Sequence, residues 1–433
     1  MTTSLLGRGP AKRIVLTTWG SYGDLFPVLA LGRGLHDRGH DVIVAAPEFY
    51  REIVTGLQLA FRPMRPDLPA IHESEAVFRR MMDPRRGTER VVCESVLPSL
   101  PAMYDDLSEI AAGADLIGTS LLALAGRLVA ETQGIPWCSI VLQPSVFLST
   151  TDPPVFGVIP GMERLRPLPP VAHRLMHHGM TFVADRWVKP WHAYRQQIGL
   201  PPDSANPLLR GQFASDLVLA LFSAAFATPQ PDWPADAVVT GFPFSDHVGN
   251  EPLTAELEAF LDEGEPPIVF TLGTSAVFAP GAFYEESIKA ARALGRRAVL
   301  LSGFNLPDGI VHRDPDMLAV TYASHARLFP RAAAVVHQGG IGTCSQAMRA
   351  GKVMLVVPYA HDQPDNAARL ADHGVAKVIP PSRYRASRVV KALGQLFVTP
   401  EYHARADRLA REVNRDHGVA AASEAIERLL RGT

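Results

Sequence analysis

The chain has 433 residues, of which 47% are hydrophobic and 20% charged, a composition typical of globular proteins and a length too great for one compact core. Lys and Arg number 42 against 44 Asp and Glu, and this net charge of −2 argues against nucleic acid as the main partner. Cys93, Cys138 and Cys344 form neither a zinc pattern nor a disulfide framework, and the N-terminus lacks the apolar core of a signal peptide. We therefore expect a cytoplasmic protein of two domains.

The first half of the chain alternates apolar runs with helical patterns. A strand predicted at 13–20 is followed by a helix at 27–40 and a second strand at 41–47. Further strands are predicted at 115–120, 136–143 and 216–222. This alternation predicts a parallel sheet covered by helices.

The same pattern restarts at "PIVFTLGTS" (267–275), which is similar to "RIVLTTWGS" (13–21). Further strands are predicted at 297–303, 317–323, 333–339 and 352–358. A stretch rich in Pro and Gly separates the halves, as expected of a connection between domains. The predicted fold is α/β, with two Rossmann-like domains whose parallel sheets face a central cleft. Their boundaries are placed at 1–225, 226–250 for the linker, 251–410, and 411–433 for a last helix that packs back toward the first domain.

The stretch "VVHQGGIGT" places a glycine-rich turn between a strand ending near His337 and a helix. Gly339, Gly340 and Gly342 allow close backbone approach, and the free N–H groups before and after Thr343 lie at the positive end of the helix dipole. An anion such as a phosphate fits such a turn. The pattern matches neither a P-loop nor a dinucleotide fingerprint. A purely structural turn is the alternative.

A polar pair follows the next strand, in "VVPYAHDQPDNAARL". Asp362 and Gln363 come before Pro364, which suits the first turn of a helix. Parallel strands place this pair at the same sheet edge as the glycine turn. A carboxylate and an amide together provide acceptors and a donor for sugar hydroxyls. The alternative is that Asp362 only caps the helix.

These motifs resemble a known family. "HQGGIGT" with "DQPDNA" resembles the donor signature of family-one glycosyltransferases with the GT-B fold, the UDP- and dTDP-sugar enzymes. "GSYGDLFPVLALGRGLHDRGHDV" resembles the antibiotic and sterol branch. "FATPQPDWPADAVVTGFP" and "LDEGEPPIVFTLGTS" resemble the rhamnosyltransferase catalytic subunit of bacterial rhamnolipid synthesis.

The resemblance implies a set of donor-binding residues. In chain order they are Thr274, Tyr322, Ala323, His325, His337, Gly339, Gly340, Gly342, Thr343, Asp362 and Gln363. Tyr322 would stack on the uracil or thymine ring, His337 and the turn amides would hold the diphosphate, and Asp362 with Gln363 would bind the sugar. Plant members have Trp-Ala-Pro-Gln where this chain has Tyr-Ala-Ser-His, so the choice between the two bases stays open.

The resemblance also implies inverting, metal-independent transfer with no cofactor besides the nucleotide sugar. Asp24 in "GSYGDLFP" matches the position of the base that takes the acceptor proton, and burial would raise its pKa for that task. The alternative is that Asp24 is the N-cap of the following helix. Ser21 is a candidate contact to the donor phosphates.

The predicted activity is transfer of L-rhamnose or glucose from a dTDP- or UDP-sugar to a hydroxyl of a small hydrophobic acceptor, such as a flavonoid, polyketide or lipid. The Pro-rich, aromatic stretches at 142–157 and 162–191 are expected to wall the acceptor pocket in the first domain. A nucleotide-sugar 2-epimerase and a non-catalytic nucleotide-sugar-binding partner of another transferase are the alternatives. The sequence leaves the oligomeric state and contact with a membrane surface open.

Overall fold

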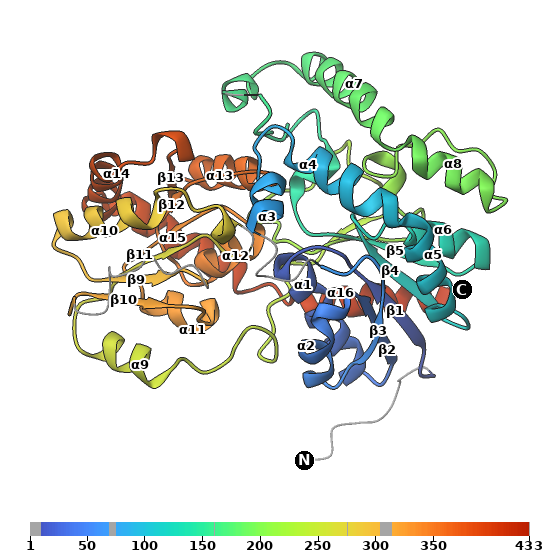
Figure 1. Cartoon of the computed structure of the whole chain (residues 1–433), viewed down its shortest axis with the longest axis horizontal. Coiled ribbons are helices and arrows are strands. Elements are labelled where there is room, and N and C mark those ends of the chain that lie inside the picture. The colour runs from blue at the N-terminus through green and yellow to red at the C-terminus, as the bar shows by residue number, and fades with distance from the viewer. Residues whose placement is uncertain (1–9, 69–74, 160, 275, 304–313, 433) are drawn as a thin grey trace.

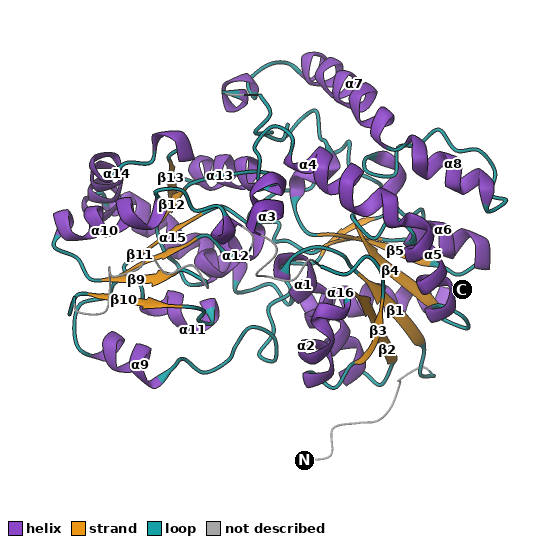
Figure 2. Cartoon of the chain, viewed as in Figure 1, coloured by secondary structure: helices purple, strands orange, loops and turns teal. Residues whose placement is uncertain are grey.

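The computed structural model describes residues 10–68, 75–159, 161–274, 276–303 and 314–432. They form two α/β halves that lie side by side (Figure 1). Each half has a wholly parallel sheet flanked by helices, as Figure 2 shows. The predicted fold class is confirmed.

The first sheet has seven strands in the order β3-β2-β1-β4-β5-β6-β7. In chain order they are β1 (Arg13–Thr17), β2 (Asp41–Ala46), β3 (Ala60–Pro63), β4 (Leu116–Ser120), β5 (Trp137–Val141), β6 (Val218–Ala220) and β7 (Ala237–Val239). The helices of this half are α1 (Tyr22–Asp37), α2 (Arg51–Gly56), α3 (Glu75–Met81), α4 (Gly87–Arg90), α5 (Leu100–Ile110), α6 (Gly126–Gln133), α7 (Pro170–Trp187) and α8 (Lys189–Gln197). Alternate residues of β1 point to opposite faces: Leu16 packs with α1, and Val15 packs with α5 and α6.

The second sheet has six strands in the order β10-β9-β8-β11-β12-β13. They are β8 (Ile268–Thr271), β9 (Ala298–Leu301), β10 (Met317–Val320), β11 (Ala334–His337), β12 (Met354–Val356) and β13 (Ala376–Val378). The helices are α9 (Ala255–Asp262), α10 (Phe283–Leu294), α11 (His325–Leu328), α12 (Ile341–Arg349), α13 (Gln363–Asp372), α14 (Ala386–Val398) and α15 (Pro400–Val413).

Three short strands, β3, β7 and β13, were not predicted. Each has only three or four residues, too few for a clear periodic pattern. β7 lies inside the predicted linker at 226–250 and hydrogen-bonds to β6. The connection between the two sheets therefore begins after Val239, later than the predicted start at 226. The first helix also begins earlier than predicted, at Tyr22, because Ser21 caps it.

The last helix, α16 (Gly418–Gly432), leaves the second half and packs on α1 of the first. Figure 1 shows this red helix beside the blue N-terminal elements. The Arg38 guanidinium contacts the carboxylates of Glu424 and Glu427. At Gly34 the two helices approach so closely that an added Cβ would lie 2.3 Å from Val419 Cγ1.

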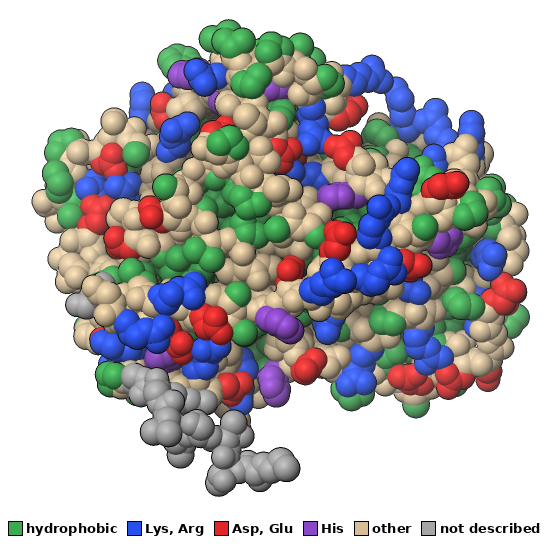
Figure 3. Space-filling view, turned by 180° about the vertical axis from the view of Figure 1, so that it is seen from behind, with side chains coloured by type: hydrophobic (Ala, Val, Ile, Leu, Met, Phe, Trp, Pro, Cys, Tyr) green, Lys and Arg blue, Asp and Glu red, His purple; other side chains and the backbone are tan. Residues whose placement is uncertain are grey.

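Charges of both signs are interspersed over the face shown in Figure 3. This distribution agrees with the small net charge and offers no basic stripe for nucleic acid on that face. Within the ranges that the structure describes, no helix is long and apolar enough to cross a membrane.

The close approach of α1 and α16 predicts that Gly34→Val destabilises the protein. The added carbons collide with Val419, and overpacking of this kind costs about 1–3 kcal/mol. The measurement is the free energy of unfolding by denaturant. Gly56→Val is the control, because an added Cβ there meets no atom within 4 Å. Equal stabilities for the two variants would contradict the close contact.

Candidate active site

The order of strands reverses beside the first strand of each sheet, between β1 and β4 and between β8 and β11. Ligands of such sheets bind beyond the carboxyl ends of the strands at this point. The segment after β1 carries Asp24, the loop after β8 carries Thr274, and the glycine turn follows β11. The two edges meet, because the charge of Asp24 acts on Asp362 and Ile341 packs against the cores of both halves.

The glycine turn leads from β11 into α12. Gly339 has φ +92°, and a Cβ there would lie 2.9 Å from Val356 Cγ1, so only glycine fits without displacement. No side chain caps the N-terminus of α12, whose first residue is Ile341. A Cβ on Gly342 would meet no atom within 4 Å. The first turn of α12 therefore offers amide donors, at the positive end of the helix dipole, beside open space.

His337 is fully buried at the end of β11. Its Nδ1 accepts a hydrogen bond of 3.1 Å from the Gly339 N–H, which places the proton of the neutral ring on Nε2. Nε2 is buried and has no partner among the described residues. Burial, aided by His325, lowers the pKa of His337 to about 3. The ring is therefore a neutral hydrogen-bond donor.

Asp362 precedes α13, but its side chain makes no cap hydrogen bond. Its Oδ2 instead accepts from Asn366 Nδ2 at 2.7 Å. The alternative that Asp362 only caps the helix is therefore wrong. Burial, and then the charge of Asp24, raise the pKa of Asp362 to about 7.

Gln363 is buried beside it and supports the preceding turn. Its Oε1 accepts from the backbone N–H groups of Tyr359 at 2.8 Å and Ala360 at 3.2 Å. The amide oxygen is thus occupied, which leaves the amide nitrogen as the group available to a ligand. Among the described residues, no group of three His, Cys, Asp or Glu side chains could hold a metal ion.

Asp24 is the third residue of α1 and forms a capping box with Ser21. Its Oδ2 accepts from the Ser21 N–H at 2.8 Å and the Ser21 hydroxyl at 3.2 Å, and Ser21 is the N-cap. The predicted alternative is therefore wrong about which residue is the N-cap, although Asp24 contributes to the cap. Burial raises the pKa of Asp24 to about 6 despite these hydrogen bonds. Gly20 makes room for the carboxylate, because a Cβ there would lie 2.3 Å from Oδ2.

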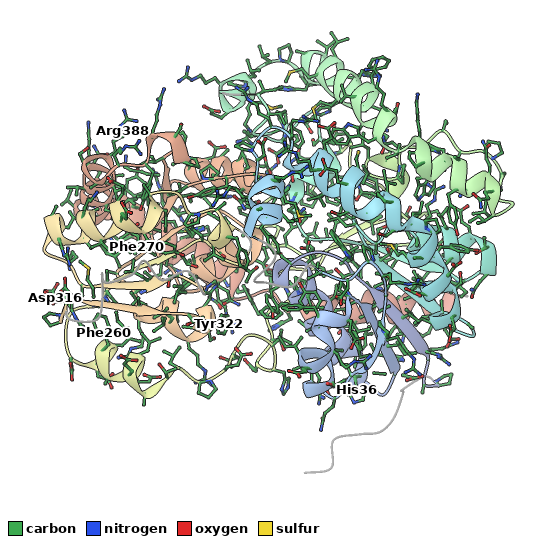
Figure 4. All side chains as sticks on the ribbon, viewed as in Figure 1. His36, Phe260, Phe270, Asp316, Tyr322 and Arg388 are labelled. Atoms are coloured by element: carbon green, nitrogen blue, oxygen red, sulfur yellow. The ribbon has the colours of Figure 1, made fainter. Side chains whose placement is uncertain are left out.

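The remaining predicted donor residues lie around α11 and the two turns. Tyr322 is 50% exposed on the C-terminal half (Figure 4), and its hydroxyl donates to Glu251 at 3.3 Å. The His325 ring stacks on Phe329 at 4.4 Å, and burial lowers its pKa to about 4. Ala323 and Thr343 are buried, whereas Thr274 is exposed.

Sequence reasoning missed two residues that hold the site together. Asn366 is fully buried, and its Nδ2 donates both to Gly339 O at 2.9 Å and to Asp362. Its position four residues after Asp362 within "DQPDN" was the available signal. Gln338 packs between the turns of Gly273 and Gly340, where added Cβ atoms would lie 2.2 Å and 2.9 Å from its Nε2.

Two family models match the sequence. Residues 14–149 match the glycosyltransferase family 28 N-terminal domain, and residues 305–427 match the erythromycin biosynthesis protein CIII-like C-terminal domain. O-mycaminosyltylonolide 6-deoxyallosyltransferase of Streptomyces fradiae is 34% identical over 96% of this chain and 97% of its own length. Vancomycin aglycone glucosyltransferase of Amycolatopsis orientalis is 32% identical over 97% of this chain and 98% of its own.

Solved structures agree on the fold. The glycotransferase of kitacinnamycin superposes with a TM-score of 0.69 at 22% identity, covering 98% of this chain and 100% of that one. Spinosyn rhamnosyltransferase SpnG complexed with thymidine diphosphate gives a TM-score of 0.63 at 18% identity, covering 96% and 100%. The chain belongs to the family-one glycosyltransferases of the GT-B fold, as its motifs predicted. The particular resemblance to the rhamnolipid enzyme stays a prediction.

The open space at Gly342 predicts that Gly342→Val blocks an anion without disturbing the fold. A valine side chain would occupy the space beside the α12 amides, so dTDP should bind at least about tenfold more weakly, a loss of about 1.4 kcal/mol. Isothermal titration with dTDP measures this, and thermal melting checks the fold. Gly394→Val in α14 is the control, because a Cβ there also meets open space. Unchanged dTDP affinity in Gly342→Val would place the diphosphate elsewhere.

Proposed function

We propose that this glycosyltransferase moves a hexose, L-rhamnose or glucose, from a dTDP- or UDP-linked donor to a hydroxyl of a small hydrophobic acceptor, with inversion. One observation carries the proposal: two partly buried carboxyl groups of raised pKa, Asp24 of the first half and Asp362 of the second, are near enough for the charge of Asp24 to raise the pKa of Asp362, beside an uncapped helix N-terminus. The named acceptors of the two relatives, O-mycaminosyltylonolide and vancomycin aglycone, support a natural-product hydroxyl compound as substrate.

The donor would lie along the edge of the second sheet. The amides that open α12 and the His337 Nε2–H would hydrogen-bond the diphosphate, with Thr274 reaching it from the neighbouring turn. Tyr322 would stack on the base, Ala323 and His325 would border the base edge and ribose, and Asp362 and Gln363 would hold sugar hydroxyls. The thymidine diphosphate bound by SpnG supports a thymine base.

The reaction would be an in-line displacement at the anomeric carbon. The acceptor oxygen forms a bond to that carbon, its proton passes to the carboxylate of Asp24, and the bond to the diphosphate oxygen breaks with its electron pair on the diphosphate. The α12 amides and His337 stabilise the departing charge, so the step requires no metal ion. A base with a pKa near 6 is ionised at neutral pH yet basic enough to accept a proton.

A transfer assay read by mass spectrometry tests the proposal. Purified protein is incubated with dTDP-rhamnose or UDP-glucose and with a hydroxy fatty acid ester, a flavonoid, a sterol or a polyketide aglycone, with and without EDTA. Glycosylated product at equal rates in EDTA is the expected result. Epimerised donor without product would favour the epimerase, and dTDP binding without any turnover would favour the non-catalytic partner.

Asp24→Asn is expected to abolish transfer and leave dTDP affinity unchanged. The amide oxygen of Asn can still accept from the Ser21 N–H, so the cap survives, but no base remains and turnover should fall by at least about 100-fold. In the unmodified enzyme kcat/KM should rise with pH through about 6, because the ionised carboxylate is the active form. Near-normal turnover of the variant would make Asp24 a structural residue only.

A further inference from the structure

An ionic network joins the two halves next to the donor site. Asp152, in the loop that follows β5, accepts hydrogen bonds from Arg369 of α13 at 2.5 Å and from Arg166 at 2.8 Å. Arg369 also donates to Asp365 at 2.8 Å, and Arg166 pairs with Asp372. The network therefore alternates three carboxylates with two guanidinium groups across the boundary between the halves.

The centre of this network is buried. The side chain of Asp365 is 0% exposed and that of Arg369 5%, against 17% for Asp152. Charges removed from water are stable only when fully paired, and loss of one partner leaves another buried and unpaired. Both oxygens of Asp365 are in use, since Oδ2 accepts from Arg369 and Oδ1 accepts from the Val155 N–H at 3.0 Å. The network therefore sets the position of the loop backbone as well as its charges.

The loop at 149–157 is also fixed near its first and last residues. On its own domain, Asp232 accepts from the Thr150 N–H at 2.6 Å and from the Ser149 hydroxyl at 2.7 Å. Further along, Gly157 lies so close to α13 that an added Cβ would be 3.3 Å from Pro364 Cγ. The stretch predicted to wall the acceptor pocket thus rests on the first turn of α13, the turn that Asp362 and Gln363 open.

A second contact from the first half reaches the same turn. His361, which has φ +58°, precedes Asp362, and its Nδ1 lies 3.1 Å from the Thr88 hydroxyl of α4. The sugar-binding pair is therefore bordered on two sides by the acceptor domain. A shift of the loop at 149–157 would therefore change the packing against the turn that carries Asp362 and Gln363.

We propose that Asp152, Asp365 and Arg369 are positioning residues that lock the acceptor-wall loop at 149–157 onto the donor-sugar helix α13. The inference rests on the proposed function and extends it: one set of ion pairs sets the distance between the acceptor hydroxyl and the donor sugar. None of the three is among the residues proposed to hold the donor or to accept the proton. Their effect on transfer is expected through orientation, where small displacements cost about 10- to 100-fold in rate.

Asp152→Asn is the first variant, because it removes the carboxylate that pairs the loop with Arg369 and leaves the Asp365–Arg369 pair within α13 intact. We expect the acceptor KM to rise and kcat to fall, together about 10- to 100-fold in kcat/KM, while dTDP affinity stays unchanged. Donor hydrolysis per transfer should also rise, since water competes better with a misplaced acceptor. Asp152→Glu should recover part of the loss, because it restores the charge that pairs with Arg369.

Arg292→Gln is the matched control, because it removes an arginine from an exposed ion pair with Asp314 inside one domain. An unchanged acceptor KM and unchanged donor hydrolysis per transfer in Asp152→Asn would overturn the inference. A fall in kcat alone that equals the fraction of unfolded protein would also overturn it.

Hydrogen exchange of the loop separates this inference from the proposed function. If the unmodified enzyme transfers no sugar, the proposed function has failed. Hydrogen exchange at 149–157 then tests by itself whether the ion pairs fix the loop onto α13. Faster exchange in Asp152→Asn than in the unmodified protein and in Arg292→Gln supports it. Equal exchange in all three proteins overturns it.

Discussion

The structure depends on the parallel order of its two sheets. In each half the first strand lies between the second and the fourth strand of that half. Connections leave such a strand in opposite directions, so a gap opens at its carboxyl end. In the first half this gap receives the N-terminus of α1, and in the second half it receives the glycine turn and α12. The unpaired backbone N–H groups at the N-termini of α1 and α12 therefore lie at the boundary between the two halves, where they can donate hydrogen bonds to charged groups.

The carboxylates at that boundary illustrate how burial and hydrogen bonding compete. Asp24 accepts two hydrogen bonds from Ser21, and Asp362 accepts one from Asn366, all of which favour the ionised form. Burial outweighs them in both residues, and the mutual repulsion of the pair raises the pKa of Asp362 further. The result is two groups that titrate near neutrality in a protein whose other carboxylates mostly lie on its surface.

Much of the fold and of the donor side could be predicted from the chain alone. The strands that precede Asp24 and Asp362, and the strand that ends at His337, are marked by apolar runs, and Gly339 is required by its φ of +92° and its close approach to Val356. The prediction missed β7, a three-residue strand held only by its neighbour, and it did not include the hydrogen bond by which the Gln363 amide oxygen supports its own turn. These features depend on partners that no local pattern identifies.

The sequence by itself determined the βαβ order, the phosphate-type turn and the family, because strands, turns and motifs are set by residues close together in the chain. The sequence also predicted a last helix that packs toward the first domain. Only the tertiary structure decided that α16 meets α1 at Gly34, that the charge of Asp24 acts on Asp362, and that Asp152 pairs with Arg369. Each of these contacts joins residues more than 200 positions apart. Their energies come from burial and charge pairing, which exist only once the two halves have packed.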